Sequence, residues 1–340
     1  MLHIPRYAYS REARDARRAF RRCYLAPVIF MALGSLIISG ITVAVAILFG
    51  ERGLLELSTN VYVIYALQVV VLYMIAFPVF LLLTSGMQRT IYKKRRIGLG
   101  EFCAAFFISC FAVTVGSIVS SVVSYFIPTA NEGALGGLVN DAPLWLVIAV
   151  VVIIGPVVEE IAFRKVLIDR LSVYGDRLAV FVSATIFGFF HGNHEQLVYA
   201  VMLGVILGYV YTSTRNVVHT VILHALINLI GTIPAMLVNS SLAEISSVAE
   251  GAVIDGGAAI RYLLSLGVLL LTRYGFAVAG MVILLYCIFA EKISFSQKCG
   301  IRLRGGDLVR CTVLNFGAVI FFLYFGLQIA LYINPGLLSF

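Results

Sequence analysis

Charged residues are scarce in this chain of 340 residues, and their scarcity excludes most classes of soluble protein. Asp, Glu, Lys and Arg make up 12% of the sequence, whereas 61% of the residues are hydrophobic. An average soluble domain carries roughly twice that share of charge. The apolar residues form continuous runs instead of alternating with polar ones, which favours helices over a β-barrel. The sequence therefore predicts an all-α, polytopic membrane protein.

Several familiar signatures are also missing. None of the six cysteines forms a Cys-x-x-Cys pair, so free thiols are favoured over a disulfide framework or a metal site. The zinc-protease pattern His-Glu-x-x-His and the serine-hydrolase pattern Gly-x-Ser-x-Gly are absent. His194-Glu195, which follows His191, has its members in the wrong order for zinc. The chain shows no internal repeat, low-complexity tract or separate soluble domain.

About nine apolar stretches, with eight as the other possible count, are long enough to span a membrane. They lie near 25–49, 61–84, 99–126, 144–171, 178–193, 196–213, 217–238, 263–290 and 312–333. With the N-terminus inside, 22 of the 25 Lys and Arg residues fall on the inner side, and the outer loops 127–143 and 239–262 are weakly acidic. This positive-inside bias predicts a cytoplasmic N-terminus in the cell membrane. The net charge of +8 thus reflects topology, and no nucleic-acid partner is expected.

The chain divides into four regions on this basis. Residues 1–24 form a basic cytoplasmic arm with seven Arg and two acids, which predicts a basic helix on an anionic leaflet or a topology determinant. Residues 25–143 hold the N-terminal spans, residues 144–238 the predicted catalytic core, and residues 239–340 an outer loop followed by the C-terminal spans.

The least ordinary stretch is the one from Gly155 to Arg164, where two adjacent carboxylates end a long apolar run. Ionisable residues within a span are costly and usually functional. Glu160 and Arg164 are four apart, with the acid first, which favours an ion pair. Glu159 is then the unpaired carboxylate and the predicted reactive one. Pro156 is expected to bend the helix and to make room for water beside Glu159.

Two further apolar stretches carry groups able to do chemistry. His191 lies near the end of the fifth predicted span, and His224 and Asn228 share one helix face in the seventh. Glu159 and His191 are each 16 residues from the turn at Gly175, or roughly 24 Å from it at the helical rise. An acid, two imidazoles and an amide are therefore predicted to meet in one buried pocket.

Such a set suits hydrolysis in two ways, which the residues alone leave open. A desolvated carboxylate can act as general base on water while N–H groups stabilise the oxyanion. Alternatively, Glu159, His191 and His224 can hold Zn²⁺ with a position open for water. Outside hydrolysis, the same groups fit a proton-coupled transporter, or a scaffold or immunity protein without catalysis.

The three motifs together resemble those of the CPBP family of intramembrane endopeptidases, which includes type II CAAX prenyl proteases and the Abi proteins of bacteriocin processing and immunity. The family pattern is read here as Glu159-Glu160-x-x-x-Arg164, Phe187-x-x-x-His191 and His224-x-x-x-Asn228, in that order. The run from Met202 to Tyr211, with Gly204 and Gly208 four apart, is also typical of the family.

This resemblance implies a protease acting on membrane-anchored peptides or proteins, with each role carried over by position. Glu159 would activate water, and His191 would hold that water or a metal. His224 and Asn228 would form the oxyanion hole, and Glu160 and Arg164 would orient the site. The resemblance leaves the metal question open and does not assign a prenylated substrate. Surrounding membrane lipids are the other expected partner.

Overall fold

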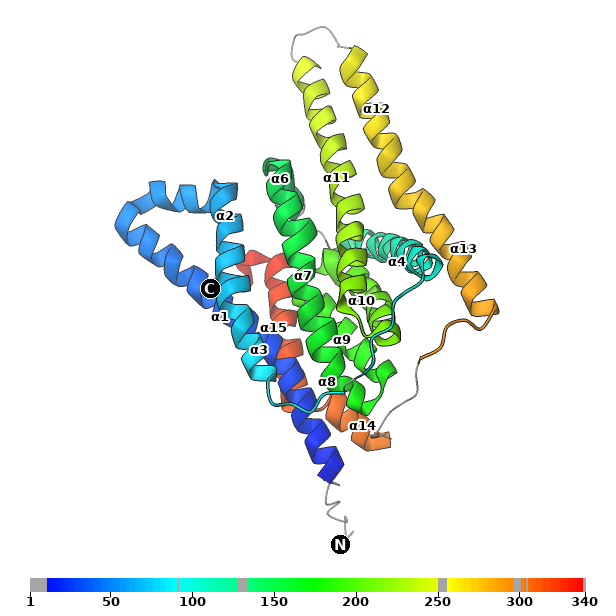
Figure 1. The fold of residues 1–340 in the computed structure, drawn as a ribbon. Coiled ribbons are helices and arrows are strands. Elements are labelled where there is room, and N and C mark those ends of the chain that lie inside the picture. Colours follow the sequence, from blue (N-terminus) through cyan, green and yellow to red (C-terminus); the bar gives the residue numbers. More distant parts are fainter. Residues whose placement is uncertain are drawn as a thin grey trace.

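The computed structural model of the chain describes residues 11–90, 92–127, 134–249, 256–295, 301, 303 and 305–338. Every regular element in these ranges is a helix (Figure 1). Eight helices there are long and apolar enough to cross a membrane, which confirms the predicted polytopic helical bundle. They are α1 (Arg11–Thr59), α2–η1–α3 (Val61–Thr84), α4 (Leu99–Phe126), α6 to η4 (Leu144–Tyr174), α10 (His194–Thr214), α11 (Val217–Ala249), α12–η5–α13 (Gly256–Phe289) and α15 (Phe316–Ile333).

Three of these spans are composite, because α-helical turns alternate with wider π-helical ones. The second span consists of α2 (Val61–Leu67), π-helical η1 (Gln68–Ala76) and α3 (Phe77–Thr84). The fourth consists of α6 (Leu144–Val147), π-helical η2 (Ile148–Ile154), α7 (Gly155–Glu160), π-helical η3 (Ile161–Ile168), α8 (Asp169–Leu171) and the 3₁₀ turn η4 (Ser172–Tyr174). The span after α11 consists of α12 (Gly256–Leu270), π-helical η5 (Leu271–Gly275) and α13 (Phe276–Phe289). π-Helical turns bond residue i to i+5 and are frequent at functional sites. The span that carries Glu159 contains two of them.

The predicted span at 178–193 is shorter in the structure than the sequence predicts. It folds as α9 (Asp176–Phe190), whose 15 residues measure about 22 Å at the α-helical rise. That length is below the ~30 Å hydrocarbon core of a bilayer. Helix α9 packs against η3 and α10. The described ranges therefore hold eight long apolar helices, and the shorter α9 leads the chain from the end of α8 back to the start of α10.

Close packing of α9 on α10 depends on two glycines, as the spacing of small residues predicts. A Cβ atom added to Gly204 would lie 3.0 Å from the Cα atom of Ala184. At Gly208 it would lie 2.9 Å from a methyl group of Val180. Because α9 ends next to His191, this contact fixes the height of the imidazole relative to α10.

Helix α1 joins the basic arm to the first span without a break. The arm from Arg11 onward is helical and continues to Gly50, where a positive φ of 60° kinks the chain; residues 1–10 lie outside the described ranges. Ala16, Phe20 and Cys23 on its apolar face are buried against the bundle. The arm is therefore docked on the protein along one face, which differs from a helix lying separately on the membrane surface.

The predicted loop at 239–262 is mostly helical. Helix α11 extends to Ala249 and α12 begins at Gly256, and residues 250–255 lie outside the described ranges. Shorter elements are α5 (Ala134–Asp141), α14 (Gly305–Thr312) and the 3₁₀ turn η6 (Pro335–Leu338). The start of α1, the end of α3, α8 and α14 lie at one end of the bundle (Figure 1). The five described cysteines are free, and Cys299 lies outside the described ranges.

Candidate active site

Glu159 and Glu160 sit on the short helix α7, between the two π-helical segments of the fourth span. Neighbouring residues on a helix point about 100° apart, so the two carboxylates enter different surroundings. Glu160 is completely buried, whereas the side chain of Glu159 retains 22% of its exposure. One acid is therefore enclosed in the bundle and the other reaches an open space.

Glu160 holds two partners from different spans. Its Oε2 atom lies 3.2 Å from Nε of Arg164, one turn later on the same span. Its Oε1 atom accepts a hydrogen bond of 2.9 Å from Nδ1 of His224 on α11. All three side chains are at most 4% exposed. The Arg164 contact is a charge pairing with poor hydrogen-bond alignment, since neither paired atom meets the angular criteria of a hydrogen bond. Glu160 thus ties α11 to the fourth span.

Phe187 packs at the centre of the cluster, which explains an aromatic residue in the second motif. Its ring centroid lies 4.5 Å from the guanidinium carbon of Arg164, an arrangement that stabilises a buried cation. The ring also meets His191 and His224 edge-on, with centroids 5.0 and 5.8 Å away. The aromatic residue thereby connects all three motifs.

Both imidazoles are oriented through Nδ1. His191 Nδ1 donates to the backbone oxygen of Phe187 over 2.8 Å, and His224 Nδ1 donates to Glu160. A carbonyl or carboxylate oxygen can only accept, so these tautomers leave each Nε2 available as an acceptor. His224 Nε2 lies 3.7 Å from Oε2 of Glu159, which is too long for a direct hydrogen bond. The arrangement brings Glu159 and His224 together without joining them.

Glu159 and His191 line one cavity of about 170 Å³. The other polar side chains on its wall are Gln68, Tyr73, Asn193 and Gln196, and its apolar wall is formed by Phe30, Met31, Leu72, Phe77, Phe80, Val158, Ala162, Phe163 and Phe190. A water molecule occupies about 30 Å³ in the liquid. The cavity therefore has room for water and for part of a peptide beside the carboxylate.

Tyr73 is a cavity residue that sequence reasoning missed. It lies on η1 in the second span, far in sequence from the three motifs, and its hydroxyl accepts a hydrogen bond of 3.1 Å from Nε2 of Gln68. The phenolic O–H remains able to donate to another group. The available signal was a Gln and a Tyr five residues apart within an otherwise apolar span.

Asn228, like His224, is not part of the cavity wall, which only Glu159 and His191 of the motif residues line. The Nδ2 atom of Asn228 donates to the backbone oxygen of Val151 over 2.9 Å. In η2 the N–H of Gly155 bonds to the oxygen of Val150, so the next N–H in that register would bond to Val151. Residue 156 is proline and has no N–H. Asn228 thus satisfies the carbonyl that Pro156 leaves unpaired.

The sequence left open whether Glu159, His191 and His224 hold a metal ion. The two imidazoles have the tautomers that metal-bound histidines adopt, with Nδ1 held by an acceptor. Over the described ranges, however, no group of three or more His, Cys, Asp and Glu side chains comes together closely enough to hold a metal ion. Glu159, His191 and His224 therefore do not form a ligand set in this arrangement.

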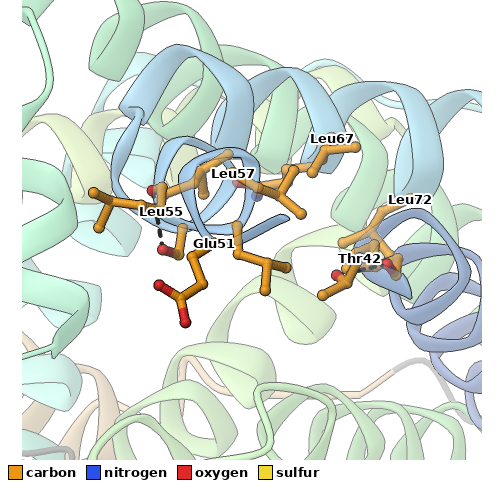
Figure 2. Close-up of a pocket in the computed structure, with 11 residues that line it drawn as sticks. Thr42, Glu51, Leu55, Leu57, Leu67 and Leu72 are labelled. Carbon is orange, nitrogen blue, oxygen red and sulfur yellow. Dashed lines mark hydrogen bonds between the residues drawn. The ribbon is translucent and has the colours of Figure 1, made fainter. Parts of the chain in front are cut away.

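A larger apolar groove opens next to the cavity. It measures about 740 Å³ and lies between the upper part of α1 and the α2–η1 span, with Leu55, Leu57 and Leu67 on its walls and the carboxylate of Glu51 at its edge (Figure 2). Gln68 and Leu72 line both the groove and the cavity. The two spaces are therefore neighbours that share these two side chains.

Comparison with known proteins independently supports a membrane protease. A family model described as type II CAAX prenyl endopeptidase Rce1-like matches residues 141–230, which contain Glu159, His191 and His224. The "Putative membrane peptidase YdiL" of Bacillus subtilis (strain 168) is 28% identical over 140 residues. That match covers 40% of this chain and 57% of the relative. No solved structure matches the chain significantly.

The family model falls on the stretch that holds the buried cluster and the part of the cavity wall that includes Glu159 and His191. The family model begins at residue 141, so Tyr73 and the groove lie outside the matched part. Within that part, Glu159, His191, Asn193 and Gln196 provide polar side chains to the wall of one cavity. Residues 141–230 are therefore similar to the type II CAAX prenyl endopeptidases, and the resemblance of this chain to the CPBP family applies to that part.

Proposed function

We propose that the protein is an endopeptidase that hydrolyses peptide bonds of membrane-associated substrates, with Glu159 as the general base on water. One observation carries the proposal: Glu159 shares a cavity of about 170 Å³ with His191, and its Oε2 atom lies 3.7 Å from Nε2 of His224. A positioned carboxylate in a mainly apolar cavity can accept a proton from water. The attack of that water on a peptide carbonyl is the step we assign to this site.

We assign different roles to the two carboxylates. Glu160 is committed to Arg164 and His224 and is sealed from the cavity. It is a positioning residue that fixes the tautomer of His224 and directs Nε2 toward Glu159. The attacking water can donate one hydrogen bond to Glu159 and the other to an imidazole Nε2, as the tautomers allow. Transfer of one proton from the water to Glu159 then yields the hydroxide nucleophile. Glu159 passes that proton to the leaving amine when the peptide bond breaks.

The oxyanion requires a donor on the cavity wall, and Tyr73 meets that requirement. Its hydroxyl is oriented by Gln68 and lines the cavity that Glu159 enters. A preorganised donor near the developing charge lowers the barrier substantially. The resemblance assigns this role to His224 and Asn228. The Asn228 amide already donates to Val151, which favours Tyr73 as the donor in this conformation. No step of the proposed reaction involves a metal.

The neighbouring groove suggests the substrate class. Its apolar walls suit the hydrocarbon part of a membrane anchor, and the shared residues Gln68 and Leu72 place its inner end at the cavity. We propose that a peptide tethered to an apolar anchor lays the anchor in the groove and the scissile bond beside Glu159. The positive-inside bias of the sequence supports a cytoplasmic N-terminus in the cell membrane.

The direct test is cleavage in isotopically labelled water. The purified chain is mixed with membrane-anchored peptides in H₂¹⁸O, with and without a metal chelator. We expect cleavage in both conditions, with one ¹⁸O atom in the new carboxylate of the product. Cleavage abolished by chelator would refute the metal-free mechanism. No cleavage with any peptide, together with proton-dependent uptake in vesicles, would indicate a transporter instead.

A further inference from the structure

The other end of α1 carries a charged cavity that the proposed protease site does not use. Arg14, Arg17, Arg18 and Arg21 line a space of about 330 Å³ together with Asn315 and Phe316 of the α14–α15 corner. These four arginines lie within eight consecutive residues of one helix. The spacing of three and four puts them on one helix face, so the cavity has a guanidinium-rich wall and a second wall from another span.

The remaining charges on this part of α1 point elsewhere. At 100° per residue, Glu12 and Asp15 lie roughly 110° or more from the centre of the arginine face. The apolar residues that dock α1 on the bundle, including Ala16 and Phe20, occupy a separate face. The arginine face is therefore separate from the two acids of this segment and from the face that docks on the bundle.

The second wall is held rigidly in place. Asn315 is fully buried; its Oδ1 accepts from the N–H of Ala318 and its Nδ2 donates to the oxygen of Cys311. A Cβ atom added to Gly317 would lie 2.4 Å from the backbone oxygen of Arg21. The first turn of α15 therefore abuts α1, and the N–H groups of a helix start add positive potential.

Exposed apolar side chains lie in the second wall and just before it in the chain, where Phe316 lines the cavity and Val313 and Leu314 precede it. Val313, Leu314 and Phe316 are 52%, 60% and 64% exposed, although they lie directly before and at the start of the last span. Exposed apolar residues next to clustered arginines are the arrangement expected where headgroups meet acyl chains. A free inorganic anion would use the arginines and leave these three residues in water.

We infer that the cavity between the arginine face of α1 and the α14–α15 corner binds the phosphate headgroup of an anionic phospholipid. Arginine matches phosphate geometry with paired N–H donors. The volume accommodates one headgroup, and the acyl chains would extend over Leu314 and Phe316. The lipid would thereby fasten α1, which also forms one wall of the groove, to the last span. This inference is independent of the proposed peptidase activity.

The experiment uses the full chain in detergent with phosphatidylglycerol, phosphatidylcholine or inorganic phosphate, and measures binding by native mass spectrometry. We expect phosphatidylglycerol to bind at least about tenfold more tightly than phosphatidylcholine. The triple variant R17Q/R18Q/R21Q should lose at least about tenfold in that affinity. The matched control K93Q/K94Q/R96Q removes three exposed charges from the loop after α3 and should change the affinity less than twofold.

Three results would overturn the inference: equal binding of both lipids, equal losses in the two triple variants, or inorganic phosphate binding as tightly as phosphatidylglycerol. If the arginine variant does not fold, hydrogen exchange of the unmodified chain answers the same question. Phosphatidylglycerol should slow exchange at residues 11–22 and 313–318 relative to phosphatidylcholine. Unchanged exchange there would equally refute the site.

Discussion

Glu159 and Glu160 are neighbours in sequence with different surroundings, and that difference is the basis of the proposed chemistry. The i,i+4 spacing to Arg164 was sufficient to expect a partner for Glu160. The hydrogen bond from His224 to Glu160 was not predictable, because residue spacing says nothing about which face of a distant helix meets which carboxylate. Tyr73 was missed for the same reason, since its place in the cavity depends on packing between two spans far apart in sequence.

Removing the buried charge should cost stability more than removing the cavity charge. In Glu160→Gln, Arg164 loses its buried counter-ion and His224 loses its charged acceptor. Breaking a buried ion pair from one side costs about 3–5 kcal/mol. We expect the midpoint of thermal unfolding in detergent to fall much further for Glu160→Gln than for Glu159→Gln. Equal midpoints for the two variants would show that Glu160 does not organise the cluster.

Tyr73→Phe tests the oxyanion donor. Loss of one such donor lowers kcat by roughly 10²–10³-fold, and KM should change little because the ring remains. Tyr65→Phe is the matched control, since Tyr65 lies in the same span, is 2% exposed and does not line the cavity. Steady-state rates on one anchored peptide would decide the point. A full rate in Tyr73→Phe would remove the phenol from the reaction.

At the scale of elements, the fourth span presents its carboxylates through an irregular helix. The sequence predicted a bend at Pro156, but not the two π-helical segments, because these depend on contacts with neighbouring spans. Asn228 of α11 donates a hydrogen bond to the Val151 oxygen, which Pro156 leaves without a backbone donor. This pairing gives a structural reason for an amide one turn after His224.

A double-mutant cycle tests that pairing. Asn228→Ala leaves the Val151 oxygen without a donor and should destabilise the protein by about 1–2 kcal/mol. Pro156→Ala restores an N–H at residue 156, so the same Asn228 change should cost less in that background. Unfolding midpoints of the four proteins measure the coupling. Additive effects, with a loss of activity in Asn228→Ala that Pro156→Ala does not relieve, would instead support Asn228 as the oxyanion donor.

At the scale of the whole molecule, composition and hydrophobic runs predicted the helical bundle and all eight long spans. Two features differ from the prediction or were not predicted, the length of α9 and the groove beside α1, and each has a physical cause. Helix α9 is shorter than the predicted span because it ends at Phe190, next to the turn at Gly192 with its positive φ of 66°. The groove beside α1 could not be read from sequence, because it arises from the kink at Gly50 and from how α1 leans on the second span.

The groove makes a prediction of its own. Leu55→Trp would fill part of the space and should raise KM several-fold for an anchored peptide, because the anchor competes with the indole ring for the same apolar walls. The rate on a short peptide without an anchor should stay the same. Leu48→Trp serves as the control, because Leu48 is 72% exposed and does not line the groove. Equal KM values for all three proteins would exclude the groove as the anchor site.

The most direct measurement is the initial cleavage rate of a membrane-anchored peptide by the unmodified chain, Glu159→Gln and Glu195→Gln. Glu195 is the matched control, since it lies in the same core, contacts the Tyr332 hydroxyl and is absent from the cavity wall. We expect Glu159→Gln to remain folded and to lose at least about 10³-fold in rate, with Glu195→Gln near the unmodified rate. A Glu159→Gln protein that cleaves as fast as the unmodified chain would contradict the assignment of Glu159 as the base.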